Sequence, residues 1–206
     1  LVRFGNFADA LPILNKVFEY DENSVNAKIL ISLCNAETGQ YNNSDDYKGL
    51  ADRNAYAALI EGLLCDSPKD AIEFFKKSLT LDKYLVDNYY QLAKCYQKLQ
   101  NDDMVLDSYD KYLLLNPNNV LIYIEYARYL ISKSKIKDAQ RKLRKAIKLD
   151  ENNQEILNML FYISYILVKE NVCEYNIKEA IMLADGISDF KYPELKSELV
   201  VMLKEL

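Results

Sequence analysis

Hydrophobic residues recur along the chain at spacings of three and four positions, and rarely in strict alternation. This spacing places apolar side chains on one face of an α-helix, whereas alternation would indicate strands. Glycine and proline, which interrupt helices, occur only 5 and 4 times among 206 residues. The pattern therefore predicts an all-α protein with about ten to twelve helices.

The helical pattern repeats along the chain with a period of 34 residues. Similar segments begin at Ser78, Tyr112 and Ala146, each 34 residues after the previous one. Units at 52–85, 86–119 and 120–153 bring large and small residues into alignment, as expected for pairs of antiparallel helices with small residues where they cross. In the first halves of the last two units, Tyr89, Leu92, Ala93 and Tyr96 align with Tyr123, Tyr126, Ala127 and Leu130.

Three such units in register resemble the tetratricopeptide repeat, and the resemblance extends over nearly the whole chain. The sequence departs from the family pattern where Tyr or Ala replaces the usual Trp, and only Pro117 keeps the terminal proline. The resemblance implies a right-handed superhelical solenoid of antiparallel helix pairs, organised as one array over residues 1–206.

Both ends of the array are less regular. We interpret 7–20 as a half repeat and 25–51 as an irregular repeat that is seven residues shorter than a period. The shortfall leaves two alternatives, namely a stunted second helix at 44–51 or one long helix over 44–64. Residues 154–194 predict a repeat in which seven inserted residues lengthen the first helix, and 195–206 predict an amphipathic capping helix.

Helix termini are marked by capping residues and prolines. Ser67 followed by Pro68 and Asp70 predicts a helix N-terminus, and Asn176 followed by Glu179 predicts another. Pro117 cannot continue a helix, so it predicts a turn between units.

Composition argues against catalysis. The chain has no histidine, so catalytic triads and imidazole-ligated zinc sites are excluded. The five glycines are scattered and form no phosphate-binding loop. Acidic pairs such as Asp102 and Asp103 fit helix N-termini, where they interact favourably with the helix dipole. We therefore predict no enzyme activity, no catalytic residue, no metal and no cofactor.

Four cysteines without a CxxC motif favour reduced thiols and a cytoplasmic protein. No apolar run approaches the 18 residues of a membrane span. The sequence begins without Met and within a predicted element, so we expect it to be a piece of a longer protein.

The resemblance implies that the first helix of each pair lines a concave groove that binds peptides. The tyrosine faces and cations there suit a peptide with apolar and acidic residues, although tyrosines used only for packing would give the same pattern. The predicted groove residues are Tyr56, Tyr90, Gln91, Lys94, Lys98, Glu125, Arg128, Tyr162 and Tyr165. The carboxylate-clamp residues of chaperone-binding family members are absent, which disfavours that role.

The segment 133–148 carries eight cations and one anion, while the whole chain has a net charge of −5. This segment predicts either a solvated outer face or a docking surface for an acidic partner, RNA or an anionic membrane. The negative net charge disfavours nucleic acid. The predicted basic surface comprises Lys137, Arg141, Lys142, Arg144, Lys145 and Lys148.

These features predict a non-catalytic scaffold that binds a partner protein or peptide in its groove. The alternatives are a peptide-sensing regulator, a dedicated chaperone, or the substrate-recruiting part of a larger enzyme. Self-association through the terminal helices is a further alternative.

Overall fold

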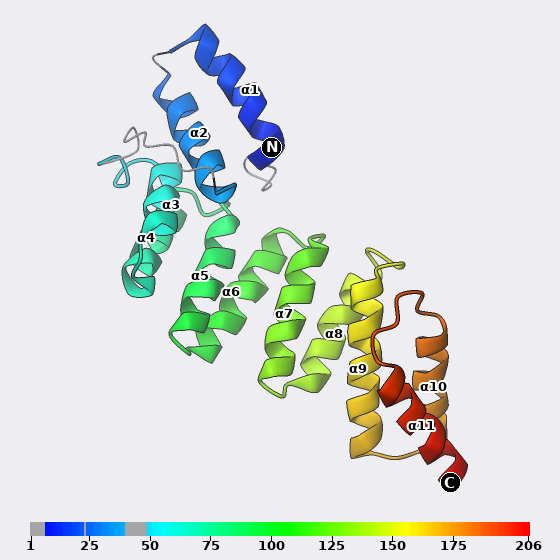
Figure 1. Cartoon of the computed structure of the whole chain (residues 1–206). Coiled ribbons are helices and arrows are strands. Elements are labelled where there is room, and N and C mark those ends of the chain that lie inside the picture. The colour runs from blue at the N-terminus through cyan, green and yellow to red at the C-terminus, as the bar shows by residue number, and fades with distance from the viewer. Residues whose placement is uncertain (1–6, 23, 40–48) are drawn as a thin grey trace. The chain divides into compact units, whose positions relative to one another are not determined.

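The computed structural model describes residues 7–22, 24–39 and 49–206, and these form eleven helices and no strand (Figure 1). The predicted all-α fold class is therefore confirmed over the described residues. The chain divides into two compact units, residues 1–117 and residues 118–206.

Unit 1 consists of three helix pairs (Figure 1). The short connections fold each pair back on itself, so that α1 packs on α2, α3 on α4, and α5 on α6, while α2 contacts α3 and α4 contacts α5. The helices are α1 (Phe7–Tyr20), α2 (Val25–Glu37), α3 (Ala55–Leu64), α4 (Pro68–Leu81), α5 (Asp87–Lys98) and α6 (Asp102–Leu115).

The structure excludes one long helix over 44–64. Residues 49–53 form turns, and α3 starts only at Ala55. The Asn54 side chain fixes this start, because its Oδ1 accepts hydrogen bonds from the backbone N–H groups of Tyr56 and Ala57, both at 3.0 Å. The alternative of a stunted helix at 44–51 lies mostly outside the described residues, and 49–51 are not helical.

Two helix pairs of unit 1 differ in the size of the side chains at one pair of equivalent positions. A Cβ atom added to Gly62 in α3 would lie 2.5 Å from the ring of Phe75 in α4, so only glycine allows this close approach. One period later, the equivalent positions hold Tyr96 and Tyr109, which are both buried. The α3–α4 pair therefore packs a ring against a glycine, whereas the α5–α6 pair has two buried rings at the equivalent positions.

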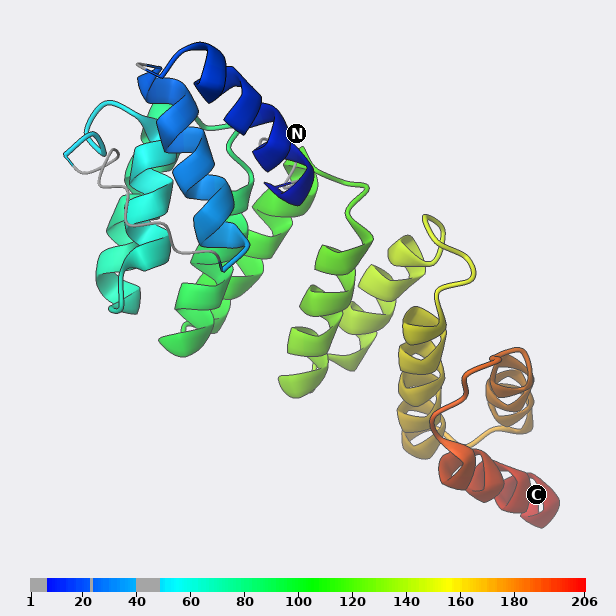
Figure 2. The same ribbon diagram turned by 45° about the horizontal axis from the view of Figure 1, so that its top comes forward.

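Unit 2 consists of α7 (Val120–Ser132), α8 (Ile136–Ala146), α9 (Gln154–Glu170), α10 (Glu174–Asp185) and α11 (Pro193–Glu205). Helix α9 has 17 residues, whereas α7, the first helix of the preceding pair, has 13. Helices α8 and α10 flank α9 in both views (Figures 1 and 2).

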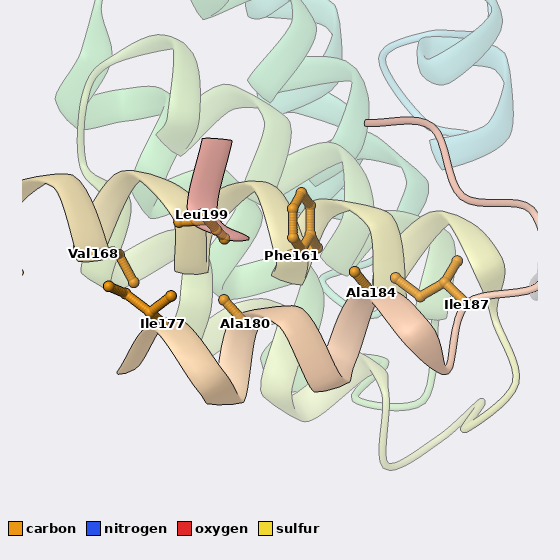
Figure 3. Packing of buried hydrophobic residues seen from close by; sticks show 7 residues of the cluster. All are labelled: Phe161, Val168, Ile177, Ala180, Ala184, Ile187 and Leu199. Carbon is orange, nitrogen blue, oxygen red and sulfur yellow. The ribbon is translucent and has the colours of Figure 1, made fainter. Parts of the chain in front are cut away.

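The core of unit 2 joins α9, α10 and α11 (Figure 3). Phe161 and Val168 of α9 face Ala180 and Ile177 of α10, and Leu199 of α11 closes the cluster. All five residues are almost fully buried. Because α11 contributes to this core, it covers apolar surface of the last helix pair.

Helix termini follow the predictions in unit 1 but not entirely in unit 2. Ser67 caps α4 as predicted, because its Oγ accepts from the N–H of Asp70, and Pro68 is the first residue of the helix. The prediction that Asn176 caps a helix is wrong, since α10 begins two residues earlier. Cys173 is the cap, and its Sγ accepts from the N–H of Asn176 at 3.5 Å.

The same turn recurs at the ends of α5 and α7, one period apart. Gln100 and Ser134 both adopt a left-handed conformation with φ of 57°. The following N–H groups, of Asn101 and Lys135, donate to Tyr96 and Leu130 in the last turns of the helices. This helix ending directs the chain back for the second helix of each pair.

Candidate functional site

In unit 1, predicted groove residues of α5 interact with one another and with α2. Gln91 is 9% exposed, and its Nε2 donates to Glu37 Oε1 at 3.4 Å. Lys94 Nζ lies 5.2 Å from the ring centre of Tyr90, within the range of a cation–π contact. Tyr90 also meets Tyr112 of α6 edge to face, with ring centres 6.4 Å apart. Together with Glu37, the α5 residues Tyr90, Gln91 and Lys94 and Tyr112 of α6 therefore form a polar and aromatic surface.

Two carboxyl groups of this surface have raised pKa values. Burial raises the pKa of Glu37, although the charge of Lys94 and the hydrogen bond from Gln91 oppose the shift. Burial, together with the negative charge of Glu37, raises the pKa of Asp87 to about 7. The buried Oδ2 atom of Asp87 has no hydrogen-bond partner among the described residues. An unpaired, partly desolvated carboxyl group favours its neutral form or an added donor.

A cavity of about 310 Å³ lies beside this surface, between α3, α4 and α5. Glu37, Gln91, Lys94 and Lys98 contribute polar side chains to its lining. Tyr56 is half-buried near the start of α3 and does not line the cavity. The structure thus brings together three of the predicted groove residues of unit 1 at one cavity and leaves Tyr56 apart.

In unit 2, the first helices α7 and α9 form a pocket of about 350 Å³. Arg128 of α7 makes an exposed ion pair with Glu155 of α9 at one side of this pocket. Tyr162 lies at another side, with its ring centre 5.6 Å from that of Tyr192. The pocket therefore combines aromatic and thioether surface with charges of both signs. Its lining consists of Arg128, Ile131, Glu155, Asn158, Met159, Tyr162, Lys191 and Tyr192.

One wall of the pocket belongs to the segment between α10 and α11, and two amides of α9 hold it in place. Asn158 is 2% exposed, donates to the carbonyl of Asp189 at 2.8 Å and accepts from the N–H of Lys191 at 2.9 Å. Gln154 Oε1 accepts from the backbone N–H groups of Ser188 and Asp189. These hydrogen bonds satisfy backbone groups that a loop would otherwise leave to solvent, and they fix the position of Lys191 and Tyr192.

Aromatic contacts also fix Tyr192. Its ring stacks on Phe161 at 6.1 Å between centres and meets Phe190 edge to face at 6.4 Å. Phe161 is fully buried and contacts Phe190 at 4.8 Å. Tyr192 thus rests on the core of unit 2, so the pocket wall is rigidly supported.

The remaining predicted groove residues of unit 2 lie outside the pocket. The Tyr165 hydroxyl donates to Glu198 Oε2 of α11 at 2.6 Å, and Lys169 pairs with the same carboxylate at 2.5 Å. The hydrogen bond to Glu198 raises the pKa of Tyr165, while Lys169 lowers that of Glu198. Glu125 is half-buried on α7. Tyr165 therefore contributes to the attachment of α11.

The predicted basic surface lies on α8 and the turn that follows it. Arg141 pairs with Asp138 on the same helix, and Lys142 lies over the ring of Tyr126 at 4.3 Å. Arg144 lines a cavity between α8, α9 and α10. Lys137, Lys145 and Lys148 are exposed. The six cations thus have different surroundings, and Arg144 lines a cavity.

Other candidate sites are absent from the described part of the chain. No group of three or more cysteine, aspartate or glutamate residues there could hold a metal ion. None of its helices combines the length and the apolar character needed to cross a bilayer. All four cysteines are free thiols, and burial raises the pKa of Cys34 to about 11.

Sequence reasoning missed Lys191, Tyr192 and the positioning role of Asn158. The segment 186–192 lies at the end of the irregular repeat 154–194, so the regular units that end at residue 153 do not show what it contacts. A usable signal was the cluster Phe190, Tyr192 and Pro193, because two aromatic residues directly before a helix start predict burial against a neighbour.

Comparison with known proteins agrees with this architecture. Residues 86–119 match the tetratricopeptide repeat family, over the same bounds as the second regular unit. No curated protein matches the chain significantly in sequence.

Two solved structures share the fold over nearly the whole chain. The crystal structure of the APC/C hetero-tetramer Cut9–Hcn1 aligns with a TM-score of 0.59 and 20% identity, covering 99% of this chain and 41% of that one. YrrB, described as a TPR protein with an unusual peptide-binding site, aligns with a TM-score of 0.54 and 17% identity, covering 94% of this chain and 98% of that one. The chain therefore contains a tetratricopeptide repeat at 86–119 and shares the helical fold of these structures.

Proposed function

We propose that this chain is a non-catalytic protein-interaction scaffold that binds a partner peptide along the first helices of its repeats. The observation that carries the proposal is the pocket of unit 2, where Arg128, Tyr162 and Tyr192 converge. Pockets that combine rigid aromatic surface with a few charged groups are typical of peptide recognition.

The chemistry of the pocket suggests which peptide it binds. Met159, Tyr162 and Tyr192 offer apolar surface for one large side chain. Arg128 and Lys191 can pair with a carboxylate, with Arg128 exchanging Glu155 for the ligand. Because the Arg128–Glu155 pair is exposed, breaking it costs at most about 1 kcal/mol. We infer that the pocket takes an apolar residue next to an acidic one.

Unit 1 supports a different preference. Glu37 interacts with the charge of Lys94 and with Asp87, so the surface there has both signs of charge. A donor from a ligand could interact with the carboxylate of Glu37, which lines the cavity of unit 1. We therefore propose that a peptide reaching unit 1 presents an amide or a cation there, in contrast to the acidic residue expected at unit 2.

The experiment is a selection of peptides from a displayed random library on the whole chain, followed by fluorescence-polarisation titration of the enriched peptide. Arg128→Glu and Lys191→Glu each reverse a charge at the pocket. Each should weaken binding at least about tenfold, or ~1.4 kcal/mol. The matched control is Lys69→Glu, an exposed charge reversal on α4 in unit 1, which should change the affinity less than about twofold.

Two results would overturn the proposal. One is a selection that enriches no peptide. The other is an enriched peptide whose affinity falls as much with Lys69→Glu as with both pocket variants, because binding would then follow net charge. Lys191 makes no side-chain ion pair among the described residues, so its substitution separates loss of recognition from loss of folding.

A cytoplasmic location belongs to the same proposal. The four free thiols suit a reducing compartment, where a scaffold of this kind meets its partners. A scaffold and a sensing regulator differ in one observable: only the regulator should change its small-angle scattering profile when the selected peptide binds.

A further inference from the structure

A second cavity of unit 2 lies on the other side of α9 from the peptide pocket. It has a volume of about 480 Å³ and lies between α8, α9 and α10. Its α9 residues include Leu160, Ser164 and Leu167, whereas the peptide pocket uses Met159 and Tyr162 of the same helix. Because successive residues of a helix are rotated by about 100°, the two sets face opposite sides of α9.

We call this cavity the α8–α10 groove. Its floor is a stripe of two leucines and one serine on α9. Leu160, Ser164 and Leu167 follow one another at spacings of four and three, so they lie in line along α9. Met182 and Leu183 of α10 add apolar surface, and Met182 is 72% exposed. Methionine adapts its shape to different partners, and an exposed one beside a leucine stripe is typical of a binding surface.

The lengths of the helices explain why the stripe is uncovered. Helix α9 has 17 residues and is about 25 Å long, whereas α8 has 11 residues and is about 16 Å long. Helix α8 therefore cannot cover the whole flank of α9. Helix α10 packs its buried residues Ile177 and Ala184 into the core rather than across this flank.

One wall of the groove is strongly cationic. Helix α8 carries five cations and one acid, and its residues Gln140 and Arg144 line the groove. Lys137 lies three positions before Gln140 and therefore on the same face of α8. Within the described ranges, neither Lys137 nor Arg144 has an acidic partner. The opposite wall presents Asn176 and Glu179, and Glu179 accepts a hydrogen bond from Tyr175.

We propose that the α8–α10 groove docks an amphipathic α-helix of a partner protein, with acidic residues along the edge that meets α8. The apolar stripe suits the apolar face of a helix over about two turns, which is the helix-in-groove mode of recognition. Carboxylates on the docked helix would neutralise Lys137 and Arg144, two cations of this wall that have no acidic partner among the described residues. A second copy of this chain fits less well, because its most acidic helix, α6, already buries Val105, Tyr109 and Tyr112 in its own unit.

This interaction goes beyond the peptide pocket and does not depend on it. Since the two sites use opposite faces of α9, a peptide in the pocket and a helix in the α8–α10 groove can be bound at the same time. Helix α9 would then connect two partners through one rigid element.

The test is a displayed library of helical peptides, with fixed apolar positions on one face and randomised residues along both edges, selected on the whole chain. Asp and Glu should be enriched along one edge. The best peptide should bind at least about tenfold more weakly to Arg144→Glu and to Met182→Glu than to the unmodified chain. Both side chains are exposed, so folding should persist.

The matched control is Lys145→Glu, which makes the same charge change in the same last turn of α8 but outside the groove. It should weaken binding less than about threefold. Arg128→Glu should leave this affinity unchanged, which separates the result from that of the peptide pocket. Equal losses for Arg144→Glu and Lys145→Glu, or no acidic enrichment, would overturn the proposal. So would a dimer in sedimentation equilibrium that Arg144→Glu dissociates, because the occupant would then be a second copy.

Discussion

Helices α5 and α9 are first helices of their pairs, two periods apart, and they use equivalent positions differently. In α5, Gln91 and Lys94 contact or face Glu37 in a polar, partly buried surface. In α9, the equivalent Met159 and Tyr162 line a pocket with Tyr192. The repeat determines where these side chains lie on the first helix of a pair, but not which residues they contact.

The residues that they contact belong to segments outside the regular repeats. Glu37 is the last residue of α2, which belongs to the irregular region 25–51. Tyr192 belongs to the segment between α10 and α11. The surroundings of each first helix therefore depend on irregular segments that pack against it.

The largest effect should follow removal of the side chain that holds the second of these segments. Asn158→Ala loses hydrogen bonds to Asp189 and Lys191 and leaves a buried space, so it should destabilise the chain by about 3 kcal/mol in urea unfolding. The selected peptide should lose at least about tenfold in affinity because Tyr192 is no longer held.

The control for this variant is Asn152→Ala, an exposed asparagine in the turn before α9. It should change stability by less than about 0.5 kcal/mol. Unchanged peptide binding by Asn158→Ala would show that the 186–192 segment is not needed for the pocket.

A substitution at Gly62 tests the packing of α3 on α4 in the regular repeat of unit 1. Gly62→Ala places a methyl group 2.5 Å from the Phe75 ring and should destabilise the chain by about 2 kcal/mol. Adding Phe75→Leu should recover part of this loss by making room. Circular dichroism in urea measures both. If Gly62→Ala is as stable as the unmodified chain, the close approach of α3 and α4 is not a tight constraint.

The acidic surface of unit 1 should appear as a pH dependence. The pKa of Asp87 is raised from 3.8 to about 7, so the folded state keeps its proton where the unfolded state has lost it. Stability from this group is therefore lost as pH rises between about 4 and 7.

Asp87→Asn removes that loss. The free energy of unfolding of this variant, relative to that of the unmodified chain, should increase by at least ~1 kcal/mol from pH 4.5 to pH 8. Urea unfolding at both pH values measures this difference. Asp70→Asn, an exposed acid in the first turn of α4, is the control and should show no comparable gain. A pH-independent difference for Asp87→Asn would contradict the assigned burial.

The smallest effect concerns Tyr165, which the sequence assigned to recognition. Tyr165→Phe removes the hydrogen bond to the exposed Glu198 and should cost less than about 1 kcal/mol. Peptide affinity should stay within about twofold, because Tyr165 does not line the pocket. Weaker binding by a factor of ten would restore Tyr165 as a groove residue.

Much of the fold could be predicted from the sequence because local signals determined it. The period of 34 placed Tyr96, Tyr109 and Tyr126 at positions that are buried in the structure. Ser67 and Pro68 located the start of α4 through a cap and a proline, both of which act within one helical turn.

The site could be predicted only in part, because it depends on contacts between distant residues. Arg128 and Tyr162 followed from the register of the repeats. Tyr192 did not, because its segment is held by hydrogen bonds from Asn158 to Asp189 and Lys191, which are 31 and 33 residues away in the sequence. Cys173 and not Asn176 caps α10, and the sequence did not predict this because a thiol is not among the usual capping groups. The sequence predicts a long first helix in the repeat 154–194, but the flank of α9 beside α8 can be seen only in the structure.

The central claim is that a partner peptide binds in the pocket of unit 2. The most direct measurement uses the selected peptide with a photoreactive group at its apolar position, crosslinked to the whole chain and mapped by mass spectrometry. Crosslinks should concentrate on 155–162 and on 191–192, and excess unlabelled peptide should abolish them. Crosslinks concentrated on α4, on α8 or across many helices would contradict the claim.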